Sequence, residues 1–217
     1  DSEREARKAL VEQIGGTLFT IAKDVKIQVE FNPAEVAAYR LIGYENRMLA
    51  AEDFNDDTKD AGEIGAGHRV TALYEIVPAG QPTPGPEVDP LRYQVPQSLT
   101  TMAQTGEMMT VKVRYKEADG DTSALLEFPV TDDGKGLDAA SDDTRFAAAV
   151  ASFGMLLRTS RYAGDATLDS VLRMAQDAVG ADPNGYRTEF VELVGKAQDI
   201  ADAMQAEAAA EETAEEE

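Results

Sequence analysis

The sequence lacks cysteine altogether, has a single histidine, and is only 6% aromatic. Without cysteine there can be no disulfide framework, no thiolate metal ligand and no cysteine nucleophile. A histidine-based catalytic triad could use only His68, and no nucleophile-elbow serine pattern accompanies it. These absences lead us to expect that the chain is not an enzyme.

Basic residues are also scarce, since 20 Lys and Arg face 41 Asp and Glu, which gives a net charge of -21. This excess argues against nucleic acid as a partner and repels anionic membrane surfaces, while it favours basic protein patches. No run of about 18 apolar residues is present, so we expect no membrane insertion. The sequence begins at Asp1 with no initiator methionine or signal-peptide pattern, which suggests a piece of a longer protein.

Alternating hydrophobicity predicts strands in the first part of the chain. We expect them at 25–31, at about 36–48, at 70–76, and as a hairpin of 111–115 and 126–130 around the turn Asp119-Gly120. The stretch 78–96 holds six of the nine prolines and is expected to be an extended connection.

After Asp132 the hydrophobic period changes to 3.6, which predicts three helices, with Asp165 and Asp182 as candidate N-caps. The fold class expected is α+β, with an antiparallel β-sandwich-like region followed by a C-terminal three-helix segment. The corresponding domains are residues 17–132 for the sheets and 133–205 for the helices. Residues 206–217 form an acidic, low-complexity tail.

The segment 53–63 offers the best candidate for a metal site, because Asp53, Asn55 and Asp57 place oxygen ligands at alternate positions, as the first half of a calcium loop does. The glycine position of that loop is Thr58, and the nearest acidic residue to its final ligand is Glu63. We therefore expect no cofactor in general, and we name Ca²⁺ or Mg²⁺ on these four residues as an alternative. A solvated turn rich in Asp and Asn explains the same sequence.

Two further motifs have structural explanations. The sequence Asp119-Gly-Asp-Thr-Ser123 looks superficially like a von Willebrand A metal motif, but it lies in the predicted hairpin and is expected to be a turn. The glycines of 62–67 precede a strand, whereas phosphate binding uses the amides of a helix N-terminus, so we expect a flexible connection there.

Several long segments resemble a known bacterial family. They are 10–33, 39–47, 52–55, 60–68, 70–76 and 111–116, for example Tyr39-Arg-Leu-Ile-Gly-Tyr-Glu-Asn-Arg47. They are similar to the uncharacterised C-terminal domain of YfbK-like von Willebrand factor type A proteins and its junction with the A domain. The resemblance implies that residues 1–16 are the last helix of that A domain, whose metal site would lie in residues absent from this chain. It also implies a place in the bacterial cell envelope.

The function expected is therefore a non-catalytic protein-interaction or scaffold domain that accompanies the von Willebrand A domain and binds an unidentified protein partner. The first alternative is a divalent-metal-binding module or metal-dependent enzyme that uses the loop 53–63. The second alternative is a self-association module, in which edge strands or the terminal helices pair between chains.

Overall fold

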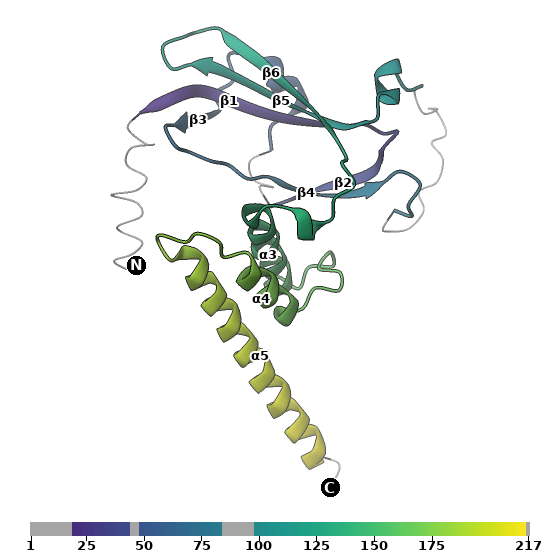
Figure 1. The fold of residues 1–217 in the computed structure, drawn as a ribbon, viewed down its shortest axis with the longest axis vertical. Coiled ribbons are helices and arrows are strands. Elements are labelled where there is room, and N and C mark those ends of the chain that lie inside the picture. The colour runs from purple at the N-terminus through teal and green to yellow at the C-terminus, as the bar shows by residue number, and fades with distance from the viewer. Residues whose placement is uncertain (1–18, 44–47, 84–97, 216–217) are drawn as a thin grey trace. The chain divides into compact units, whose positions relative to one another are not determined.

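The computed structural model of the chain describes residues 19–43, 48–83 and 98–215. The chain divides into two compact units, 1–133 and 134–217, and each is described by itself (Figure 1). The helix predicted within 1–16 and most of the proline-rich connection at 78–96 lie outside the described residues.

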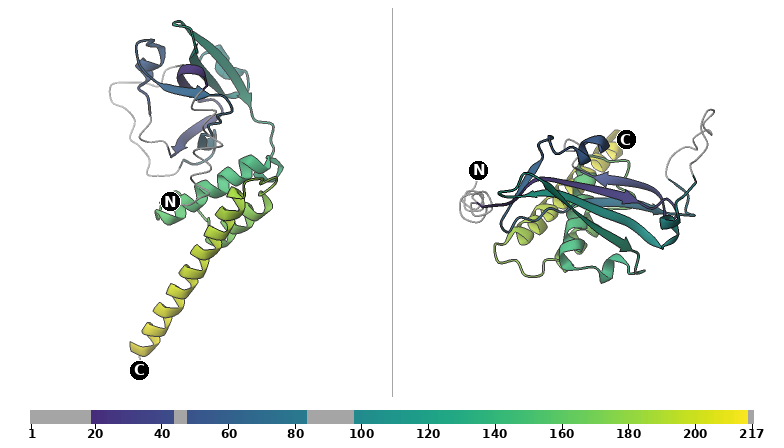
Figure 2. Two further views of the ribbon diagram at one scale, coloured as in Figure 1. Left: turned by 90° about the vertical axis from the view of Figure 1, so that its left-hand side faces the viewer. Right: turned by 90° about the horizontal axis from the view of Figure 1, so that it is seen from above.

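The first unit contains a four-stranded sheet in the order β3-β1-β5-β6, and every neighbouring pair is antiparallel (Figure 2). Its strands are β1 (Thr20–Phe31), β3 (Gly62–Gly65), β5 (Glu107–Glu117) and β6 (Ser123–Thr131). The predicted hairpin is confirmed as β5 and β6, while β1 begins earlier than the alternation indicated because its first residues interrupt the period of two.

Cross-strand pairing gathers the apolar residues of three strands on one face of this sheet. Val113 of β5 lies between Ile27 of β1 and Leu126 of β6. Two residues further along the strands, Val111 lies between Val29 and Phe128. Directly paired residues share a face, so these rows form an apolar surface across β1, β5 and β6.

A second, two-stranded sheet consists of β2 (Val36–Ile42) and β4 (Leu73–Pro78). It contacts one end of the apolar face, where the ring of Phe31 stacks on Tyr39 at 4.2 Å between centroids and meets Tyr74 edge-on at 5.3 Å. Both strands are shorter than expected: β2 ends at Ile42, and β4 begins only at Leu73.

The second unit contains three helices, as predicted: α3 (Asp142–Leu157), α4 (Leu168–Asp177) and α5 (Tyr186–Glu215). Their core is formed by residues of all three helices, namely Ala149, Phe153, Val171, Ala175 and Val194. Antiparallel sheets followed by three helices confirm the α+β class. Short 3-10 helices cover η3 (Ala51–Asn55), η4 (Thr101–Gln104) and η5 (Leu137–Ala139).

Both predicted N-caps are wrong. The cap of α4 is Thr167, whose hydroxyl accepts from the amide of Ser170 at 3.1 Å in a reciprocal capping box. Asp182 precedes the start of α5 at Tyr186, yet its carboxylate accepts from the amide of Thr188 at 2.9 Å. It therefore satisfies the first turn from outside the helix.

Candidate functional site

The acidic loop of residues 51–61 lies against the polar face of β1 and β5. Its η3 turn buries Phe54, which is only 5% exposed, and the guanidinium of Arg114 in β5 lies 5.5 Å from the centre of that ring. The loop is therefore packed on the sheet and is not a solvated turn along its whole length.

Lys26 of β1 supplies a cation beneath the loop. The residue is only 4% exposed, and its ammonium donates to the carbonyl of Asp53 at 3.1 Å and to the carbonyl of Asp56. A buried ammonium is costly unless its donors are satisfied. These two backbone bonds thus hold the loop by a positive charge provided from within the chain.

Lys116 of β5 forms a second attachment. Its ammonium donates to the carboxylate of Asp24 at 2.7 Å and to the carbonyl of Asp57 at 2.9 Å. Asp24 lies at an irregularity in the β1–β5 pairing with φ of 51°, a left-handed conformation that aspartate tolerates better than most residues. Its other oxygen accepts from the amide of Ala61 at 3.3 Å, so one carboxylate connects the sheet to the end of the loop.

Hydrogen bonds stabilise the ionised carboxylates of this cluster. The bond from Lys116 holds the pKa of Asp24 below its usual value, although burial opposes the effect. Bonds from Thr58 lower the pKa of Asp56, and a bond from Ser123 lowers that of Asp57. The bond to Asp24 in turn raises the pKa of Lys116, so this lysine of β5 is charged at neutral pH, as are the carboxylates that it holds together.

Three of the four predicted metal ligands have separate partners. The carboxylate of Asp53 faces Lys59 at 3.4 Å, and the side-chain oxygen of Asn55 accepts from Arg114 at 3.0 Å. Asp57 bonds to Ser123, and Glu63 is exposed on β3. Within the described ranges, no three acidic or histidine side chains converge on a point where an ion could bind. Metal binding here stays a prediction, which calorimetric titration with Ca²⁺ and Mg²⁺ would test.

Sequence reasoning missed the lysines and arginine that hold this loop, because alternation assigned them to a face exposed to water. A signal was available. Cations stand at every second position of β5 on the face of Lys26, and a loop rich in Asp and Asn lies in the same unit. The cations concerned are Lys112, Arg114 and Lys116.

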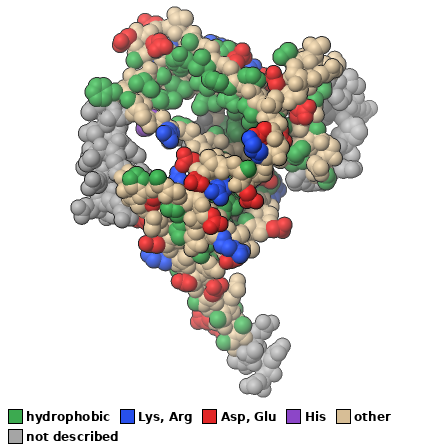
Figure 3. Space-filling view, in the orientation of Figure 1, with side chains coloured by type: hydrophobic (Ala, Val, Ile, Leu, Met, Phe, Trp, Pro, Cys, Tyr) green, Lys and Arg blue, Asp and Glu red, His purple; other side chains and the backbone are tan. Residues whose placement is uncertain are grey.

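A second candidate surface is the apolar face of the sheet beside β6. Ile27 is 52% exposed, Leu126 43% and Phe128 50%. Figure 3 shows hydrophobic side chains gathered over this sheet. The two-stranded sheet contacts the end near Phe31, and the opposite end is left exposed to solvent.

The outer edge of β6 borders this surface. The backbone amide of Asn32 donates to the carbonyl of Met108 in β5. Because backbone groups along a strand point alternately to its two neighbours, the even-numbered residues of β5 hydrogen-bond to β1 and the odd-numbered residues hydrogen-bond to β6. The backbone N–H and C=O groups of Phe128 and Leu126 therefore hydrogen-bond to β5, while those of Glu127 point away from the sheet. Pro129 belongs to the outward set, where a missing N–H costs no ladder bond.

The other motifs have structural roles. The glycine-rich loop at 62–67 was expected to be flexible, but Gly62–Gly65 is strand β3, and Gly65 pairs with Thr20. His68 is exposed beyond that strand. Asp119-Gly120 forms the turn between β5 and β6, as predicted. No described helix is long and apolar enough to cross a membrane.

Residues 16–200 match the family described as "Uncharacterized protein YfbK, C-terminal". This chain belongs to that family. The uncharacterized protein YfbK of Escherichia coli (strain K12) is 43% identical over 205 residues, which cover 94% of this chain and 35% of that protein. The chain thus spans about a third of the length of its YfbK relative. No solved structure matches the chain.

Proposed function

We propose that this YfbK C-terminal domain is a non-catalytic protein-interaction or scaffold domain that acts beside a von Willebrand A domain in a bacterial envelope protein. The supporting observation is that an exposed apolar surface borders the outer edge of β6, with which no other strand of the described residues pairs. The A domain and the envelope location are supported by the family resemblance described above.

In this proposal, an extended segment of the partner pairs with the outer edge of β6 and adds a strand to the sheet. The outward backbone groups of Leu125 and Glu127 are the donors and acceptors that an extended segment pairs with. Leu126 and Phe128 supply the apolar contacts on the face that also carries Ile27. We therefore expect a partner segment with apolar residues at alternate positions.

The test uses the intact protein that contains this chain. Partners are recovered by affinity purification from the wild type, from a deletion of this domain, and from the variant Glu127→Pro. Glu127→Pro removes one outward N–H without changing the ladder to β5, so we expect the partner to be lost. Glu127→Thr keeps that N–H and should retain it.

The apolar part of the surface has its own variant. Phe128→Lys should abolish partner recovery, whereas Leu99→Lys should not, although Leu99 is equally exposed at 53% in the same unit. Recovery of the same partners at the same yield from the deletion and from Phe128→Lys would refute the proposal.

Self-association is a second candidate, because the same edge of β6 can pair with β6 of another copy. The net charge of -21 per chain opposes it, so dimerisation should strengthen with added salt. Light scattering over a wide concentration range tests this directly. A monomeric mass throughout would exclude self-association and leave the partner proposal standing.

A further inference from the structure

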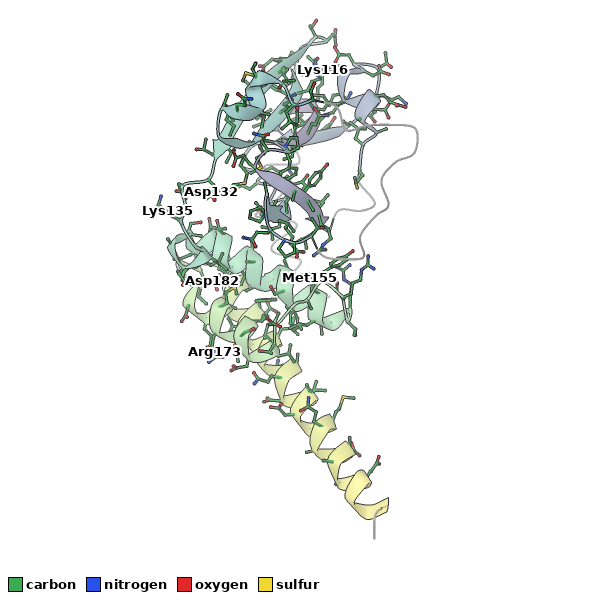
Figure 4. The ribbon with its side chains drawn as sticks, turned by 90° about the vertical axis from the view of Figure 1, so that its right-hand side faces the viewer. Lys116, Asp132, Lys135, Met155, Arg173 and Asp182 are labelled. Carbon is green, nitrogen blue, oxygen red and sulfur yellow. The ribbon has the colours of Figure 1, made fainter. Side chains whose placement is uncertain are left out.

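Helix α5 is much longer than the helices it packs on. It has 30 residues, against 16 in α3 and 10 in α4, and thus extends about 45 Å. Its last contributor to the helical core is Ala197, and every side chain from 202 to 211 is exposed. Figure 4 shows that neither α3 nor α4 reaches this distal part of α5.

The extension carries an apolar stripe. Leu193, Ile200 and Met204 are separated by seven and four residues, which places them on one side of the helix. They are 52%, 62% and 66% exposed. The stripe begins beside the buried Val194 and continues past the end of the core, so it offers a neighbouring helix a continuous apolar row.

Beyond Lys196, which lies beside the stripe, the charges of the extension have one sign. After Lys196 the sequence has no Lys or Arg up to its end at Glu217, while eight carboxylates occur in that stretch. They are Asp199, Asp202, Glu207, Glu211, Glu212, Glu215, Glu216 and Glu217. Carboxylates near a helix C-terminus oppose the helix dipole, so the extension gains from positive charge placed along it.

We infer that the stripe of Leu193, Ile200 and Met204 docks a cationic amphipathic helix of a partner protein. The apolar row provides the seam, and acidic residues near it, such as Asp199 beside Ile200 and Glu207 one turn beyond Met204, attract the lysines or arginines of the partner helix. A second copy of α5 is the wrong occupant, because it would bring two all-acidic segments together. This surface lies wholly on the helical unit and is separate from the β6 edge.

The test titrates a synthetic probe into the full chain by calorimetry. The probe is a designed helical peptide with leucine on one face and lysine on its flanks, and its control has the same composition in scrambled order. We expect saturable binding of the amphipathic peptide that weakens as salt is added. The scrambled peptide should bind at least about tenfold more weakly, since it lacks an apolar face.

Variants locate the binding surface. The double change Ile200→Ser and Met204→Ser should reduce affinity at least about tenfold, because both side chains would be buried in the complex. Leu157→Ser is the matched control, since Leu157 is 63% exposed in α3 of the same unit and should not affect binding. Circular dichroism confirms that each variant retains its helices.

Three results would overturn the inference. Equal binding of the scrambled peptide would show that charge alone drives association. Unchanged affinity of the double variant would place the peptide elsewhere. A concentration-dependent dimer, abolished by the same double variant without peptide, would show that the occupant is a second copy of the chain.

Discussion

At the scale of single residues, the buried ammonium of Lys26 attaches an acidic loop to the sheet. Lys26 is fixed by the strand β1 and reaches two backbone carbonyls of the loop 51–61. The position of this ammonium is determined by the register of the sheet. The loop is therefore ordered by the same pairing that orders β1 and β5.

We expect Lys26→Met to lower the free energy of unfolding by roughly 1–3 kcal/mol, because the carbonyls of Asp53 and Asp56 lose their donor while they stay near the sheet. Urea denaturation measures the change. Lys23→Met is the control on the same strand. The ammonium of Lys23 lies 3.8 Å from the carboxylate of Asp121, which is fully exposed, so the loss of this ion pair should change stability by less than about 0.5 kcal/mol. Equal effects of the two variants would contradict this role for Lys26.

Acid should weaken the attachment of the loop through Asp24. Its pKa in the folded state lies below the ordinary value of 3.8, so the carboxylate stabilises the fold at pH above that value. The contribution is lost as the pH falls through the folded-state pKa. Chemical denaturation at successive pH values should therefore show a steeper acid loss for the wild type than for Asp24→Asn.

Asparagine is the suitable replacement because it tolerates the positive φ of this position. Asp121→Asn provides the control, since its side chain is fully exposed, and its pH profile should parallel that of the wild type. If Asp24→Asn also parallels the wild type, the ion pair with Lys116 does not contribute to acid sensitivity.

At the scale of elements, periodicity predicted those segments whose surroundings are simple. The three helices follow from the 3.6-residue period, because each buries one face against a neighbour. The hairpin of β5 and β6 follows from alternation on both sides of a turn signal, although β6 is largely exposed. Strand β3 could not be predicted, since Gly62 and Gly65 have no side chain that marks a face, and its pairing with β1 is made by the backbone. The packing of the loop was missed because it depends on contacts of high sequence separation, such as Lys116 with Asp24.

Helix starts were mispredicted because several candidate caps lie close together. Before α4, Asp165 and Thr167 are both good N-cap residues, and only Thr167 has the serine three positions later that completes the box. We expect Thr167→Ala to destabilise the helical unit by about 1 kcal/mol. Ser152→Ala, within α3, should change stability by less than about 0.5 kcal/mol in urea denaturation. A Thr167→Ala effect as small would show that the cap is dispensable.

At the scale of the whole molecule, the chain has two compact units with different sources of stability. The sheet unit relies on strand pairing and on the ionic contacts of its loop, while the helical unit has a conventional apolar core. Residues 134–217 should fold alone, with cooperative thermal unfolding followed by circular dichroism. Non-cooperative melting of this piece would show that its core is insufficient.

Within that isolated piece, Phe153→Ala should cost about 3–5 kcal/mol, because Phe153 is 6% exposed and contacts Phe190 at 5.5 Å between ring centres. A loss of this size would unfold a marginally stable domain at room temperature. Leu157→Ala should melt like the parent, since its side chain lies at the surface.

The charge distribution of α5 also determines how proteases can attack it. Lys196 is the last site for trypsin in the chain, so trypsin releases the remaining segment as one peptide and cannot shorten it further. Beyond Lys196, a glutamate-specific protease has targets only from Glu207 onward. Cleavage by trypsin at Lys196 therefore reports loosening where α5 leaves the helical core, and cleavage by the glutamate-specific enzyme from Glu207 onward reports exposure of its C-terminal end. A bound partner should slow the glutamate-specific cleavage most.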